Sequence, residues 1–86
     1  MFEQLFPISD YYKKNIIDAV TITRAGIWWS AILLIEDPKS KKQFLSLYKW
    51  QYRGSEWRIR SKFKISKKKD ADKIVKIIND FSEKLG

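Results

Sequence analysis

The 86-residue sequence contains no cysteine and no histidine. Without thiols the chain forms no disulfide and has no thiolate nucleophile, and without imidazole it lacks the commonest general base and the usual zinc ligands. Its three glycines are isolated along the chain, so no Gly-rich phosphate-binding loop is present. Glu36 and Asp37 are adjacent but have no recognisable carboxylate partner for a two-metal site. We therefore expect neither an enzyme nor a cofactor or metal site.

Long hydrophobic runs are also missing. The longest apolar stretch, residues 27–35, is interrupted by Ser30 and is too short to span a bilayer. The first ten residues lack the basic leader and long apolar run of a secretory signal. We expect a soluble protein that is cytoplasmic or nucleoid-associated and has no membrane partner.

Acidic residues are scarce in the middle of the chain. Residues 39–69 contain twelve Lys and Arg and one acid, Glu56, a net charge of +11 in a chain whose total is only +8. Such a concentration of positive charge indicates a polyanionic partner, although a solvated basic face would give the same pattern.

Residues 44–65 alternate β-branched, aromatic and basic side chains on either side of a turn at 53–55, a pattern typical of a β-hairpin. Because neighbouring strand residues face opposite ways, simple alternation predicts an apolar side and a cationic side in the second strand. The apolar side comprises Trp57, Ile59, Phe63 and Ile65, and the cationic side comprises Arg58, Arg60, Lys62 and Lys64. If Leu45 and Leu47 join the apolar side, then Tyr48 and Trp50 stand beside the cations.

The flanking segments complete an α+β fold: a four-stranded antiparallel meander followed by a C-terminal helix, with a possible short N-terminal helix. Residues 1–8 form an apolar arm, with Phe2, Leu5, Phe6 and Ile8, that packs on the domain or on a partner chain. Ser9 or Asp10 can cap a helix through Ala19, whereas the β-branched run at 16–23 favours a strand. Further strands are expected at residues 20–24 and 27–35.

The last part of the chain has the periodicity of a helix. Beginning at Ser66 or Asp70, apolar residues recur at spacings of three and four: Ala71, Ile74, Val75, Ile78, Phe81 and Leu85. Ile77 widens this stripe beyond what a small sheet covers, which indicates a second helix from the N-terminus or from another copy. The chain is divided into an arm at 1–19 and a sheet-plus-helix region at 20–86 within one domain, whose small core predicts a homodimer.

Aromatic rings beside cations suit single-stranded nucleic acid, because rings stack on bases and cations contact phosphates. Trp57 and Phe63 are assigned to the core because they share a side with Ile59 and Ile65. Of the adjacent tryptophans, we expect Trp28 to face outward, since Ser30 lies on its side of the strand. The predicted binding residues are Trp28, Tyr48, Lys49, Trp50, Arg53, Arg58, Arg60, Lys62 and Lys64.

Two alternatives remain open from the sequence. A chromatin-type protein would lay the sheet in a groove of double-stranded DNA. A protein-interaction or assembly module would dock a partner on its aromatic face and expose a large apolar patch.

The strand order from Val20, together with the segments LSLYKW, RGSEW, RIRSKFKIS and DADKIVKIINDF, resembles the positive-cofactor-four (Sub-one) family of transcriptional coactivators over roughly the last two-thirds of the chain. The resemblance implies a dimer that holds single-stranded DNA on curved sheets, with partners in transcription or replication. It places Tyr48 where the family has a basic contact, and Arg60 and Lys62 near its basic loop-to-strand contacts. The chain lacks the family's Pro- and Gly-rich basic turn and adds the apolar arm. It has a looser likeness to the archaeal single-strand-binding ThermoDBP proteins, and its Lys- and Ile-rich composition would suit a thermophilic archaeon or its virus.

Overall fold

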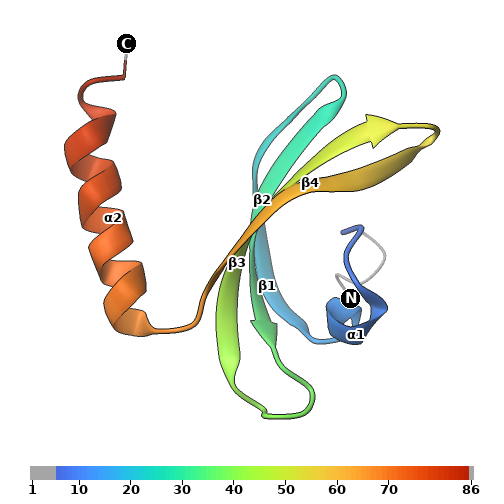
Figure 1. Ribbon diagram of the computed structural model, residues 1–86, viewed down its shortest axis with the longest axis horizontal. Coiled ribbons are helices and arrows are strands. Elements are labelled where there is room, and N and C mark those ends of the chain that lie inside the picture. The colour runs from blue at the N-terminus through green and yellow to red at the C-terminus, as the bar shows by residue number, and fades with distance from the viewer. Residues whose placement is uncertain (1–5, 86) are drawn as a thin grey trace.

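The computed structural model describes residues 6–85 and has the expected α+β architecture (Figure 1). Its elements in chain order are α1 (Asp10–Lys13), β1 (Ile16–Ala25), β2 (Trp28–Glu36), β3 (Gln43–Arg53), β4 (Glu56–Ile65) and α2 (Lys68–Ser82). The strands form one antiparallel sheet in the order β1-β2-β3-β4, so β1 and β4 are its edges. The predicted meander and C-terminal helix are therefore confirmed.

Turn residues close the two long hairpins and the polar loop between them. Gly54 and Ser55 have φ values of 63° and 67°, and a two-residue loop with both residues in this region matches the twist of the flanking strands. Gly26, with φ 58°, belongs to the other hairpin turn. In the β2–β3 loop, Asp37 accepts backbone hydrogen bonds from Ser40 (3.1 Å) and Lys39 (2.8 Å), which lower the pKa of its carboxyl.

The N-terminal helix is much shorter than the helix through Ala19 that the sequence allowed. Ser9 caps it by accepting the amide of Tyr11 at 3.3 Å, but α1 ends at Lys13 and β1 begins at Ile16. The expectation of a helix through Ala19 is wrong because the β-branched run from Ile16 pairs with β2 instead. The expected boundary at residues 19/20 consequently falls inside β1.

One face of the sheet, called the covered face, holds the core. Residues directly opposite each other in neighbouring strands share a face, so the pairs Trp29–Trp50, Ala31–Tyr48, Leu33–Ser46 and Ile35–Phe44 define it. All eight residues are buried. The alternate pairs, Trp28–Gln51, Ser30–Lys49, Ile32–Leu47 and Leu34–Leu45, define the opposite, open face.

The N-terminal arm provides the second layer over the covered face. The Phe6 ring lies 5.3 Å from the Trp29 ring and 5.9 Å from the Trp50 ring, centroid to centroid, and Ile8 is buried beside them. The indole N–H of Trp50 donates to the Pro7 carbonyl at 3.0 Å. Packing of the arm on its own domain is therefore confirmed for residues 6–8, while Phe2 and Leu5 lie outside the described residues.

A β-bulge in β4 overturns the predicted alternation. Lys49 pairs with Ser61 and Trp50 pairs with Ile59, so Arg60 has no partner in β3. The extra residue reverses the facing of everything on one side of it. Trp57 and Ile59 therefore lie on the covered face, whereas Phe63 and Ile65 lie on the open face, and the prediction of one apolar side for all four was wrong.

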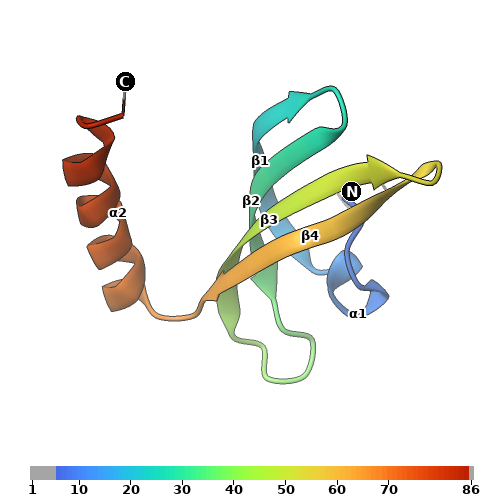
Figure 2. The same cartoon turned by 45° about the horizontal axis from the view of Figure 1, so that its top comes forward.

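Helix α2 stands away from the sheet, on the side opposite α1 (Figures 1 and 2). Its first turn includes Asp70, which the helix dipole favours, and an exposed Lys68–Asp72 ion pair at 2.7 Å. The apolar stripe expected from the sequence is present, but Val75, Ile78, Phe81 and Leu85 are exposed. Within residues 6–85 no helix has the length and apolar character needed to cross a membrane.

The covering role of the arm predicts a large stability effect at Phe6. Replacing Phe6 by Ala removes the ring that packs on Trp29 and Trp50 and should lower the free energy of unfolding by about 3 kcal/mol. Urea unfolding followed by tryptophan fluorescence at fixed chain concentration measures this loss. Tyr11→Ala is the control, because Tyr11 is half exposed in the same N-terminal region and should cost much less. Equal losses for the two variants would contradict the proposed layer.

Candidate nucleic-acid interface

Tyr48 and Trp50 form a stacked pair on the covered face. Their ring centroids are 5.3 Å apart with an interplanar angle of 2°. Their exposed fractions are 6% and 0%, because the arm and α1 pack above them. The expectation that these rings are exposed beside the cations is wrong. Burial of two large aromatic rings is favourable, so a second layer packs on this face.

Burial also changes the acidity of Tyr48. Desolvation raises the pKa of its phenol, and a hydrogen bond with the Ser46 side chain opposes this effect without cancelling it. The buried phenol therefore stays neutral to a higher pH than an exposed tyrosine would.

Trp28 faces outward as predicted, but on the other side of the sheet from Tyr48 and Trp50. It is 39% exposed, whereas Trp29 is buried. The Lys49 ammonium lies 4.7 Å from the centroid of the Trp28 ring, within the range of a cation–π interaction. With Thr23 and Ser30 they border a hollow of about 290 Å³ on the open face.

The cations of β4 are all exposed, but the bulge divides them between the two faces. Lys62 and Lys64 pair with Tyr48 and Ser46, so they share the covered face at its outer edge. Arg58 pairs with Gln51 and therefore belongs to the open face. Arg60 occupies the bulge between them. The predicted single cationic row is thus two shorter groups.

Some of these cations already have partners. A nitrogen of Arg58 lies 3.3 Å from the Glu56 carboxylate, and its Nε donates to the Arg53 carbonyl at 3.3 Å. Lys64 lies over the Phe44 ring at 4.3 Å and interacts electrostatically with Asp37. Among residues 6–85, neither Arg60 nor Lys62 forms an ion pair.

The tip of the β3–β4 hairpin carries an accessible aromatic group that is absent from the residues predicted from the sequence. Tyr52 and Trp57 pair across the strands with ring centroids 5.3 Å apart, and Tyr52 is 45% exposed. The Arg24 guanidinium lies 4.1 Å from the Trp29 centroid and 5.4 Å from the Trp57 centroid. The signal was present in the sequence, because Tyr52 and Trp57 flank the two-residue turn symmetrically and therefore pair on one face. The assumption that Trp57 shares a side with Leu45 and Leu47 conflicts with this pairing.

The nine predicted binding residues are therefore dispersed: Arg53 pairs with Glu56 beside the hairpin turn, Arg60 occupies the bulge, and the other seven fall into three places. Lys62 and Lys64 lie on the covered-face side of β4, together with the tip group of Arg24, Tyr52 and Trp57. Trp28, Lys49 and Arg58 belong to the open face. Tyr48 and Trp50 are beneath the arm. In the described part of the chain, no three His, Cys, Asp or Glu side chains gather as metal ligands would.

No model of a known protein family matches this chain, and no curated protein or solved structure is significantly similar to it. The resemblance to positive cofactor four therefore stays a prediction.

The raised pKa of Tyr48 predicts an alkaline limit to stability. The unfolded phenol ionises near its ordinary value of 10.0, while the buried phenol resists ionisation to higher pH. The contribution of Tyr48 is therefore complete below pH 10 and is lost as the pH rises through the folded-state value. Urea unfolding at a series of alkaline pH values should show this loss in the parent protein and a smaller one in Tyr48→Phe. Identical pH profiles for the two proteins would show that Tyr48 titrates as a free surface tyrosine.

Proposed function

We propose that the protein binds single-stranded DNA or RNA, with little sequence preference, along the outer edge of β4 and the tip of the β3–β4 hairpin. The observation that carries the proposal is the set of exposed cations on one edge strand beside the accessible Tyr52–Trp57 pair. Neither group requires the arm to move.

The spacing of the cations suits an extended strand of nucleic acid. Lys62 and Lys64 are two residues apart on one side of β4, so their backbones are separated by about 7 Å, the length of one extended nucleotide step. Arg60 lies in the bulge that precedes them and, like Lys62, forms no ion pair within residues 6–85. These side chains can track successive phosphates.

The rings available for stacking differ from those chosen from the sequence. Tyr52 and Trp57 replace Tyr48 and Trp50 in the proposal, because a base cannot reach the buried pair while Phe6 lies above Trp50. Stacking of one base on an aromatic side chain contributes on the order of 1–3 kcal/mol with little dependence on its identity. Arg24 extends the tip group with a guanidinium that itself packs on rings.

The wider expectations from the sequence belong to the same proposal. We propose a binding protein without catalytic activity, cofactor or metal, located in the cytoplasm or on the nucleoid and acting as a homodimer. By its resemblance to a coactivator family, it would work beside transcription or replication proteins.

A structural role for the cations is the competing explanation. Charged residues on an edge strand also prevent its unpaired backbone groups from joining another sheet. If this is their role, removal of Lys62 and Lys64 promotes aggregation and leaves oligonucleotide binding unaffected.

Titration of a labelled single-stranded oligonucleotide at several salt concentrations tests the proposal. Affinity should fall steeply with salt, and Lys62→Ala together with Lys64→Ala should reduce the slope by about 0.7 for each phosphate that is no longer neutralised. Lys73→Ala together with Lys76→Ala removes the same charge from α2 and serves as the matched control. A parent protein that does not bind at moderate salt, or equal weakening in the two double variants, would refute the proposed site.

A separate variant tests whether bases stack on the hairpin tip. Tyr52→Ala should weaken binding by about 1–3 kcal/mol, roughly 5- to 150-fold, and the effect should persist at low salt because it is not electrostatic. Tyr11→Ala, an equally accessible tyrosine in α1, should have no effect. If Tyr52→Ala binds normally, the hairpin tip does not hold a base. Tighter binding to duplex than to single strands would favour the chromatin-type alternative.

The assembly-module alternative is supported by one observation of its own. The open face and α2 expose many large apolar side chains, including Phe63 at 58% and Phe81 at 62%. Such a patch marks a surface for a macromolecular partner. It lies on the face away from the Tyr52–Trp57 pair, so assembly and nucleic-acid binding do not compete for one surface.

A further inference from the structure

The open face of the sheet carries an apolar patch that crosses all four strands. One cross-strand row consists of a residue from each strand: Val20, Ile32, Leu47 and Phe63. The next row toward α2 adds Leu34, Leu45 and Ile65, with Asp18 at its end in β1. A sheet face of this kind needs a second layer, and no element of residues 6–85 supplies one (Figure 2).

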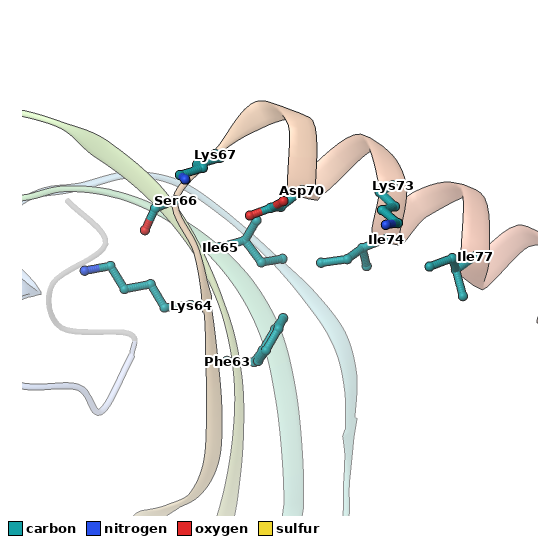
Figure 3. A pocket seen from close by; sticks show the side chains of 9 residues that line it. All are labelled: Phe63, Lys64, Ile65, Ser66, Lys67, Asp70, Lys73, Ile74 and Ile77. Atoms are coloured by element: carbon teal, nitrogen blue, oxygen red, sulfur yellow. The ribbon is translucent and has the colours of Figure 1, made fainter.

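Helix α2 has the complementary property, an apolar stripe with no sheet beneath most of it. Only its first turns approach the chain's own sheet, where Ile74 and Ile77 face Phe63 and Ile65 across a groove of about 360 Å³ (Figure 3). Beyond that groove, Val75, Ile78, Phe81 and Leu85 are exposed. The helix therefore borders its own sheet with one flank of its stripe and leaves the rest of the stripe free.

The short connection limits how the helix can use its own sheet. Only Ser66 and Lys67 separate β4 from α2, a span of at most about 7 Å. Ile65 at the end of β4 is buried and fixes the start of this connection. The helix leaves the sheet at this point and diverges from it in both views (Figures 1 and 2).

We propose that a second copy of this chain covers both surfaces. In this dimer α2 of each copy lies on the open face of the other, so that Val75, Ile78 and Phe81 pack against the row containing Val20, Ile32 and Phe63. The proposal assigns surfaces to the homodimer expected from the size of the chain, and it stands whether or not the protein binds nucleic acid.

Self-complementarity is the reason for choosing a second copy over a different protein. Each chain offers one uncovered sheet face and one unpartnered helix stripe, joined by a two-residue connection. If each copy places its α2 on the sheet of the other about a two-fold axis, the sheet face and the helix stripe of both copies are covered, and the dimer leaves neither surface for a further copy. An unrelated partner would need to supply a helix for the sheet and a separate apolar surface for α2.

The exposed area is also of the size that a stable dimer buries. Ten large apolar side chains on these two surfaces are 36–79% exposed: Val20, Ile22, Trp28, Ile32, Phe63, Val75, Ile77, Ile78, Phe81 and Leu85. Complete burial of one such side chain removes on the order of 100 Å², so together they leave about 500 Å² of apolar surface per copy. A standard interface buries about 800 Å² per partner, a little over half of it apolar.

Engineered cysteines provide the direct test, because the chain has none of its own. One preparation carries Ile78→Cys and a second carries Ile32→Cys, and the two are mixed and oxidised. The expected product is a disulfide between one chain of each kind, in excess over pairs of like chains. A chain carrying both substitutions should likewise cross-link to a second copy. If it instead forms the bond within a single chain, α2 packs on its own sheet and the proposal fails.

Solution mass gives an independent measurement. Light scattering after size-exclusion chromatography should give twice the mass of one chain for the parent protein, and one chain for Ile78→Lys. Asp80→Lys introduces the same residue on the side of α2 opposite Val75, Ile78 and Phe81 and should remain dimeric. A parent protein that is monomeric at micromolar concentration, or an Ile78→Lys variant that stays folded and dimeric, would overturn the proposal. If Ile78→Lys fails to fold, the cysteine experiment decides.

Discussion

The packing of Phe6 against Trp29 and Trp50 is the interaction on which the rest of this structure depends. It recruits the N-terminal arm as the second layer of a small core, and it is reinforced by the hydrogen bond from the Trp50 indole to the Pro7 carbonyl. Because the arm covers only one face, the opposite face of the sheet and the stripe of α2 remain uncovered. The location of the core therefore determines which surfaces are available for partners.

The same packing redistributes the candidate residues for nucleic-acid contact. Tyr48 and Trp50 become core residues, while Tyr52, Trp57 and Arg24 take the accessible positions on the same face. The exposed lysines of β4 lie along the edge of this face. Nucleic-acid binding and dimerisation are thus proposed for opposite sides of one thin sheet, an arrangement in which two binding edges can act together.

The sequence predicted the order of the elements because each carries its own local signal. Glycine-containing turns close the two hairpins, and the spacing of Ile74, Val75, Ile78 and Phe81 is helical. It did not predict the extent of α1, because capping by Ser9 and the strand preference of the run from Ile16 compete, and pairing with β2 decides between them. Such a competition is settled by tertiary contacts.

The site was less predictable than the fold for a different physical reason. The facing of every residue in β4 was inferred from unbroken alternation, and a single unpaired residue, Arg60, divides that strand into two halves of opposite facing. No residue type in the stretch from Glu56 to Ile65 marks the bulge. Likewise, the sequence showed an apolar arm but not which of the two apolar faces it would choose.

The bulge also leaves one place in β4 where the strand can lose a residue. Without Arg60, Ile59 and Ser61 would be neighbours, and their pairs with Trp50 and Lys49 would follow one another in regular alternation, so every other residue of β4 would keep its face. A deletion elsewhere in β4 would instead move the residues between the deletion and the bulge to the other face. Relatives of this protein should therefore differ in residue count at this point of β4 more readily than elsewhere in the strand.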